Sequence, residues 1–348
     1  AYHSEIIIKL QAELLRQRYT NTNPEKFRLL IRIKGVMMSK NIAMIFPGQG
    51  SQTIGMGKSF YENSPIAREM FEKAGERIGV DFTKLLFEEN DQLDKTEYTQ
   101  PAILLISIIA YTLLNEKVSV TPTMFLGHSL GEFSALCASG AINYVDAVEL
   151  VHQRGKLMGE ACQSINAGMM AILGLEDDVV ETLCEQAQTE GKKVWPANYN
   201  QAGQLVVAGI KEDLQSMESI FKEAGAKRAL LLNMSIASHC PLLESAMQPL
   251  VNAMEVMVTD SFQAPIVSNV TTDKYNTKQQ ALDLLKVQLT KPVKYKQSIE
   301  KIANELDLMI EFGNGAVLKG LNKRNAPNVE TLNVSDMESL EKVCEALS

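Results

Sequence analysis

The sequence predicts an α/β protein in which a parallel sheet carries helices and a smaller α/β unit is inserted into it. Two patterns predict this class: apolar strands that end in glycine-rich turns followed directly by helices, and a central stretch of shorter β-α-β-β-α-β alternation. The composition agrees, because 348 residues with 45% hydrophobic and 22% charged side chains exclude disordered, collagen-like and coiled-coil chains.

The first 37 residues differ in charge from the rest. They hold seven basic and three acidic residues, a net charge of +4, so the remaining chain carries −12. The boundary falls at Met37 and Met38, directly before the first strand. We expect residues 1–37 to be an N-terminal extension, helical over 5–19, that is non-native or dispensable. The alternative is a basic arm for an acidic partner. A signal peptide is excluded, because the stretch lacks an apolar core with a small-residue cleavage site.

The first predicted strand, residues 42–46, leads into a glycine-rich turn at 47–52 and helical patterning over 57–79. A very apolar helix follows over 101–114, and we expect it to be buried, because about 20 apolar residues are needed to span a bilayer. No membrane association is therefore predicted.

A second strand at 123–126 ends in the turn 127–131, and a helix follows over 132–138. The next helix is expected from Asp146 to about residue 163. A strand, a tight turn and a helix in immediate succession are typical of doubly wound sheets.

Between residues 164 and 235 the pattern changes to short elements in the order of a ferredoxin-like unit. The predicted domains are therefore a core, 38–163 and 236–348, and a ferredoxin-like subdomain, 164–235. Late in the core a strand at 306–312 precedes a Gly-Asn-Gly turn and a short helix. The predicted subdomain elements are strands at 169–173, 194–198, 204–208 and 227–232 and helices at 177–190 and 211–224.

Charge and cysteine content exclude several classes of function. A net charge of −8 and a pI near 5.3 have the wrong sign for binding nucleic acid. Five cysteines are an odd number, and none forms a C-x-x-C pair. A metal cluster and a disulfide framework are therefore not expected, and the reducing cytoplasm is the predicted compartment.

Ser129 lies in the sequence Gly127-His128-Ser129-Leu130-Gly131, which matches G-x-S-x-G. A serine on a sharp strand-to-helix turn needs glycines on both sides, because the neighbouring backbone leaves no room for Cβ atoms. Its hydroxyl then lies at the end of the sheet beside the amides of a helix N-terminus. The motif predicts a nucleophile, and the alternative is a turn that only caps a helix.

A serine nucleophile needs a base, and the chain has four histidines. His3 lies in the extension, His128 should point away from its neighbour Ser129, and His152 lies on a helix. His239 therefore remains as the base, with a buried or capping histidine as the alternative. No acid clearly completes a Ser-His-Asp triad, so we expect a backbone or amide carbonyl to hold the imidazole.

From about residue 39 to the C-terminus, the chain resembles the malonyl-CoA:acyl carrier protein transacylases of bacterial type II fatty acid synthesis. The resemblance implies an α/β-hydrolase-like core with an inserted ferredoxin-like subdomain. The motifs that carry it are Pro47-Gly48-Gln49-Gly50-Ser51-Gln52, Tyr98-Thr99-Gln100-Pro101-Ala102, Gly127-His128-Ser129-Leu130-Gly131-Glu132, Arg154-Gly155, Ser238-His239 and Gly313-Asn314-Gly315.

The resemblance also implies roles for individual residues. It makes Ser129 the nucleophile and His239 the base, and it assigns the carbonyl that orients His239 to Gln288. The oxyanion hole would be formed by the backbone N–H groups of Gln49 and Leu130, which supply preorganised donors for an acyl transfer.

Arg154 would bind the free carboxylate of malonate through its planar guanidinium. From the residues alone, Arg154 reads equally well as an arginine on a helix surface.

Two positions bear on the resemblance. The turn at Asn314 replaces a proline that is frequent in the family, and Ala237-Ser238-His239 occurs in acyltransferases for methylmalonyl units. Leu130 is typical of enzymes that use malonyl units.

The implied function is transfer of a malonyl group from malonyl-CoA to the phosphopantetheine thiol of acyl carrier protein, through a malonyl-serine ester. Coenzyme A enters as a substrate thioester, and no tightly bound cofactor or metal is expected. We expect a monomer. The alternatives are an acyltransferase for a substituted malonyl unit, a serine esterase or thioesterase of the α/β-hydrolase type, and a non-catalytic acyl-binding module. Candidate basic groups for docking the acidic carrier are Lys319, Lys323 and Arg324, or Lys291, Lys294 and Lys296.

Overall fold

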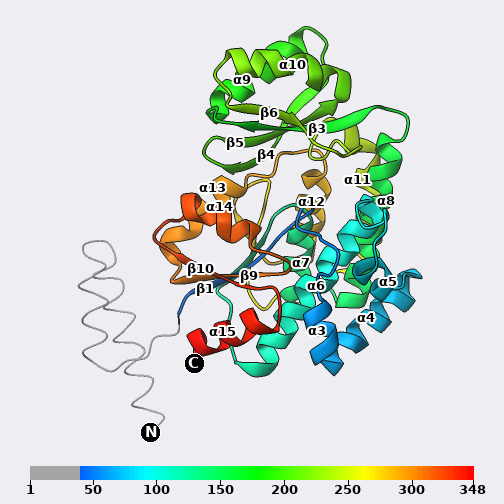
Figure 1. Ribbon diagram of the computed structural model, residues 1–348, viewed down its shortest axis with the longest axis vertical. Helices are drawn as coiled ribbons and strands as arrows, with labels where there is room; N and C mark the ends of the chain where they lie inside the picture. The colour runs from blue at the N-terminus through cyan, green and yellow to red at the C-terminus, as the bar shows by residue number, and fades with distance from the viewer. Residues whose placement is uncertain (1–39) are drawn as a thin grey trace, which may run out of the picture. The chain divides into compact units, whose positions relative to one another are not determined.

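The computed structural model describes residues 40–348, so the predicted extension at 1–37 lies outside the described residues. Two sheets organise the described chain (Figure 1). The larger has six strands in the order β10-β9-β1-β2-β7-β8. Its strands are β1 (Ile42–Phe46), β2 (Met124–Gly127), β7 (Ile266–Val267), β8 (Lys274–Tyr275), β9 (Leu308–Phe312) and β10 (Glu330–Val334).

Strand β1 is central to the larger sheet and pairs in parallel with β2 and β9. Every residue of β1, β2 and β9 is buried, which explains their nearly continuous apolar sequences. Strand β8 is antiparallel to β7, so the sheet is parallel except at this edge. The α/β core with a mainly parallel sheet is confirmed.

Helices cover the larger sheet (Figure 1). The helices are α3 (Lys58–Asn63), α4 (Pro65–Ile78), α5 (Phe82–Phe87), α6 (Thr96–Lys117), α7 (Leu130–Ala138), α8 (Tyr144–Cys162), α11 (Glu244–Met257), α12 (Lys278–Gln288), α13 (Tyr295–Ile302), α14 (Val317–Asn325) and α15 (Met337–Leu347), with short 3₁₀ turns η1 (Pro241–Leu243) and η2 (Ala303–Glu305). Their hydrophobic faces form two cores with the sheet: a large one that includes α4, α6, α7, α8 and α11, and a smaller one that includes α13 and α14.

The helical patterning over 57–79 corresponds to two helices, α3 and α4, which are separated at Ser64. Ser64 adopts an extended backbone and its hydroxyl accepts a hydrogen bond from the Ala67 N–H at 3.2 Å, which caps α4. Pro65 occupies the first position of α4, where its missing N–H costs nothing.

Helix α6 is longer than predicted and begins at Thr96 rather than at Pro101. Pro101 has no N–H to donate to the Glu97 carbonyl, and His152 of α8 donates its Nδ1–H to that carbonyl instead, at 2.7 Å. Of the described helices, α6 alone is long and apolar enough to cross a membrane, but 78% of its most apolar window is buried inside the protein. Its apolar character is thus explained by its place in the core.

The smaller sheet has four antiparallel strands in the order β4-β5-β3-β6 and carries helices α9 and α10 (Figure 1). It has a hydrophobic core of its own, centred on Met170, Val207 and Phe221. The order along the chain is β-α-β-β-α-β, and the ferredoxin-like subdomain and its boundaries stay an interpretation of this pattern. The elements are β3 (Ala167–Leu173), α9 (Asp177–Thr189), β4 (Val194–Gln201), β5 (Gln204–Ile210), α10 (Lys211–Glu223) and β6 (Arg228–Leu231).

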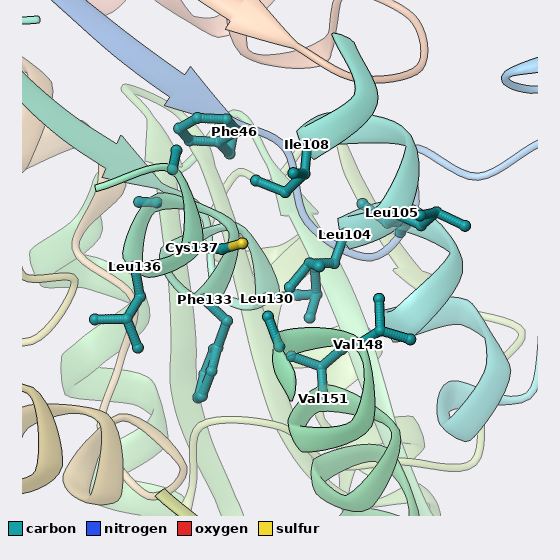
Figure 2. Packing of buried hydrophobic residues seen from close by; sticks show 14 of the residues in the cluster. Phe46, Leu104, Leu105, Ile108, Leu130, Phe133, Leu136, Cys137, Val148 and Val151 are labelled. Atoms are coloured by element: carbon teal, nitrogen blue, oxygen red, sulfur yellow. The ribbon is translucent and has the colours of Figure 1, made fainter. Parts of the chain in front are cut away.

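Helix α7 is held by the main core on several sides (Figure 2). All nine of its residues are buried, and its side chains Phe133, Leu136 and Cys137 pack among residues of β1, α6 and α8. Dense packing of this kind leaves a helix little freedom to move. The turn before α7 is therefore fixed in position, and that turn contains Ser129.

Candidate active site

Ser129 lies between the end of β2 and the start of α7, with φ 54° and ψ −109°. Positive φ is rare for a residue with a side chain and marks a constrained turn. Glycines surround it out of necessity, because a Cβ on Gly127 would lie 1.8 Å from the carbonyl carbon of Gly131. A Cβ on Gly131 would lie 2.0 Å from the carbonyl oxygen of Phe46. The geometry is that of a nucleophile elbow.

The hydroxyl of Ser129 donates a hydrogen bond to His239 Nε2 at 2.7 Å. At the other side of the ring, His239 Nδ1–H donates to the backbone carbonyl of Gln288, also at 2.7 Å. A carbonyl can only accept, so this contact fixes the tautomer in which Nε2 is free to take a proton. Ser129, His239 and Gln288 thus form a continuous relay, although they are far apart in sequence.

Burial and charge keep the imidazole of His239 neutral. The residue is 2% exposed. Burial and the nearby positive charge of Arg154 lower its pKa to about 3, although the carbonyl of Gln288 favours the protonated form. The ring is therefore a proton acceptor across the physiological pH range.

The two predicted oxyanion-hole residues lie on either side of the elbow. Leu130 is the first residue of α7, where a backbone N–H has no acceptor within the helix. The Ser129 N–H is already bonded to Asn269 Oδ1 at 2.8 Å. Gln49 lies in the turn after β1. This turn packs closely against the elbow, since a Cβ on Gly48 would lie 2.3 Å from the His128 carbonyl oxygen. This arrangement suits the predicted role of the Gln49 and Leu130 amides.

Arg154 is 1% exposed, so the reading as a surface arginine is wrong. Its Nη1 donates to Gln100 Oε1 at 2.7 Å and its Nη2 to Gln288 Oε1 at 3.0 Å, while the guanidinium lies 5.0 Å from the ring centre of Phe133. Its Nε–H has no partner among the described residues. Burial lowers the pKa of Arg154 to about 10, and the charge of Glu132 opposes this shift. The side chain is still a cation at neutral pH, and its Nε–H donor is not used by any described residue.

The turn between β2 and α7 directs the side chain of His128 toward the smaller sheet. Its Nε2 lies 2.7 Å from Oδ1 of Asn200, a residue of β4 in the smaller sheet. Burial lowers the pKa of His128. His128 therefore connects the elbow to the smaller sheet, while His239 is the histidine of residues 40–348 that contacts the Ser129 hydroxyl.

Three residues at the site were assigned no role from the sequence. Glu132 is a buried carboxylate on α7, Asn269 bonds the Ser129 N–H, and Gln100 accepts from Arg154. The charge of Glu132 in the apolar segment 130–138 was the available signal. Gln100 stands in one of the motifs that carry the resemblance, but its contact with Arg154 depends on the fold, and Asn269 gave no signal in the sequence.

A cleft of about 690 Å³ opens beside these residues. It reaches from the turn at Gln49, along Gly155 next to Arg154, to Ile236, which precedes His239 by three residues. Three lysines and three acids line it: Lys95, Lys156, Lys211, Asp94, Glu97 and Glu160. Within residues 40–348, no group of His, Cys, Asp or Glu side chains is arranged to hold a metal ion.

Comparison with known proteins gives one consistent family. The model of the acyl transferase domain matches residues 43–340. Malonyl CoA-acyl carrier protein transacylase of Haemophilus influenzae is 38% identical over 311 residues, 88% of this chain and 99% of that protein. The protein of the same name from Escherichia coli K12 is 40% identical over 308 residues, 88% of this chain and 98% of that protein.

Solved structures agree with the sequence comparison. The malonyl-CoA:acyl carrier protein transacylase of Helicobacter pylori has a TM-score of 0.86 and 46% identity, covering 89% of this chain and 99% of that one. A malonyl-transacylase solved in complex with a type II polyketide acyl carrier protein has a TM-score of 0.85 and 36% identity, covering 88% and 99%. The chain therefore belongs to the acyl transferase family, among its malonyl-CoA:acyl carrier protein transacylases.

Proposed function

We propose that the protein transfers a malonyl group from malonyl-CoA to the phosphopantetheine thiol of acyl carrier protein, through an ester on Ser129. The observation that carries this proposal is the relay from Ser129 through His239 to Gln288, with the buried cation of Arg154 bonded to the same Gln288. One site thus holds an activated nucleophile and a group that selects an acyl chain with a free carboxylate.

In the first half of the reaction, His239 Nε2 takes the proton of the Ser129 hydroxyl as its oxygen attacks the thioester carbonyl. The negative charge that develops on the carbonyl oxygen is stabilised by the amides of Gln49 and Leu130. His239 then gives this proton to the sulfur of the leaving group, and coenzyme A leaves as its thiol. In the second half, the carrier thiol gives its proton to His239 and attacks the ester, and Ser129 regains its proton.

Arg154 supplies the selectivity for malonyl over acetyl groups. Its guanidinium has five N–H donors, of which Gln100 and Gln288 occupy one each. The remaining donors include the unpaired Nε–H, so a carboxylate can be bound without loss of either glutamine. Hydrogen bonds to charged groups contribute about 1.5–3 kcal/mol each, whereas apolar fit discriminates by only about 1–3 kcal/mol.

The cleft beside Gln49 and Ile236 is the proposed entry for both thioesters. Its lysines, Lys95, Lys156 and Lys211, offer positive charge to the phosphates of coenzyme A. Coenzyme A is a substrate in this proposal, and no tightly bound cofactor takes part. All five cysteines are free, which supports a reducing cytoplasmic location.

For the acidic carrier, we favour the basic residues of α14 as the docking group. Lys323 and Arg324 lie in its last turn, and Lys319 lies one turn earlier. In the alternative group, Lys296 already forms an ion pair with Asp177 of α9, with both side chains less than one-fifth exposed. Its charge is therefore not available to a partner, and we propose that the monomer docks its carrier over α14.

The test is carrier malonylation by the full chain. Malonyl-CoA and carrier protein bearing its phosphopantetheine are mixed with wild type or Ser129→Ala, and the carrier mass is followed. We expect malonyl carrier with wild type alone. Turnover of malonyl-CoA to free malonate at the same rate with and without carrier would support the hydrolase alternative. The structure argues against a hydrolase of this type, because His239 Nδ1 is bonded to the Gln288 carbonyl and not to an acid.

A further inference from the structure

Glu132 is a buried carboxylate one turn after Ser129, and the proposed reaction does not use it. It is 1% exposed and accepts three hydrogen bonds. Its Oε2 accepts from Gln288 Nε2 at 2.7 Å and from the Asn269 N–H at 3.2 Å, and its Oε1 accepts from the Tyr275 hydroxyl at 3.0 Å. Every partner is neutral, so the carboxylate charge has no directly bonded counter-ion.

The cation nearest to this charge is Arg154, and the side-chain amide of Gln288 lies between them. Gln288 Oε1 accepts from Arg154 Nη2 at 3.0 Å while its Nε2 donates to Glu132. Glu132 and Arg154 thus form an ion pair that is bridged by the side-chain amide of Gln288. A direct pair would occupy the guanidinium donors that a substrate carboxylate needs. The inserted amide keeps the compensating charge close and leaves those donors free.

We propose that Glu132 is a positioning residue that moderates the hold of Arg154 on the substrate carboxylate, acting through Gln288. This inference rests on the proposed function and deepens it. With Glu132 ionised, its charge attracts Arg154 and repels the incoming carboxylate. The malonyl group is then bound tightly enough to be selected over acetyl and weakly enough to be transferred to the carrier. Tighter binding would not speed the reaction, since uniform tightening lowers KM without raising kcat.

Glu132→Gln separates charge from geometry. The Asn269 N–H can only donate, so it requires the carbonyl oxygen of the new amide at the Oε2 position, where Gln288 Nε2 also donates. The new amide nitrogen then faces the hydroxyl of Tyr275, which can accept as well as donate. All three hydrogen bonds are kept and the negative charge is lost.

The experiment measures the equilibrium dissociation constants of malonyl-CoA and acetyl-CoA in a Ser129→Ala background, where no ester forms, by titration calorimetry at pH 8. We expect Glu132→Gln to tighten malonyl-CoA binding by about three- to thirtyfold, the range for removing one like charge across a protein interior, and to leave acetyl-CoA unchanged. Damage to the fold does not tighten binding. Unchanged or weaker malonyl-CoA binding, or an equal change for both ligands, would overturn the proposal.

Glu311→Gln is a control for the loss of a buried negative charge elsewhere in the core; unlike Glu132→Gln it loses one hydrogen bond, because its new NH2 group faces a backbone N–H. Glu311 is also a fully buried carboxylate whose pKa burial raises to about 7, but it accepts from the amides of Leu318 and Lys319 and does not contact the site. We expect this variant to leave both dissociation constants unchanged. Selective tightening of malonyl-CoA binding in Glu311→Gln would show that net charge alone is responsible.

A second readout needs no change at position 132. Burial raises the pKa of Glu132 to about 7, and the groups that face it are Arg154 of α8, Tyr275 of β8 and the neutral amides of Gln288 and Asn269. As pH falls from 8 to 6, its charge is lost. The ratio of malonyl-CoA to acetyl-CoA affinity should then rise severalfold, and a flat ratio would contradict the proposal. Absence of carrier malonylation by wild type would instead overturn the proposed function.

Discussion

Removal of the guanidinium in Arg154→Ala tests how the site selects its acyl group. Two hydrogen bonds from Arg154 to a carboxylate, at about 1.5–3 kcal/mol each, amount to roughly 3–6 kcal/mol, or about 10²–10⁴-fold in rate. The buried position of Arg154 favours the upper part of this range, because water cannot replace the lost donors. An acetyl thioester has no carboxylate and should react as fast as before or faster.

The assay is the rate of ester formation on the protein with malonyl-CoA or acetyl-CoA, followed by quenched-flow mass spectrometry. Arg154→Lys is the matched variant, since it keeps the charge but loses the planar pair of donors, and we expect an intermediate loss. Circular dichroism controls for folding, because Gln100 and Gln288 lose a partner. Equal losses for malonyl and acetyl groups would refute this account of selectivity.

Three further predictions concern the base, the elbow and a helix cap. Because the pKa of His239 is lowered to about 3, the rate of ester formation at saturating malonyl-CoA should stay constant from pH 8 to pH 5, and a fall centred near pH 6.5 would contradict this. Gly131→Ala should prevent correct folding or remove activity, because the added Cβ would meet Phe46, and a wild-type melting temperature with full activity would disprove it. Ser64→Ala should lower the free energy of unfolding by about 0.5–2 kcal/mol in urea titrations and leave ester formation unchanged, whereas an equal loss in both would show that the cap supports the site.

The sequence predicted the parts of the site that have local signals. Gly127 and Gly131 mark the elbow because their backbone surroundings exclude any Cβ, and this requirement is visible in the sequence. His239 followed by elimination among four histidines. The interior strands β1 and β9 were predictable because burial of both faces requires an unbroken apolar run.

Features that depend on contacts across the fold were not predictable in this way. The burial of Arg154 requires Gln100 of α6 and Gln288 of α12, which are far from it in sequence. Helix α6 begins before Pro101 because His152 of α8 satisfies the carbonyl that the proline leaves free. The short strands β7 and β8, with two residues each, have no detectable period.

The most direct test of the malonyl-serine ester on Ser129 is the mass of the intact protein after incubation with malonyl-CoA alone. We expect one added malonyl group on wild type, located on Ser129 by peptide mapping and removed when carrier protein with its phosphopantetheine is added. An unmodified wild-type protein, or an equal adduct on Ser129→Ala, would contradict it.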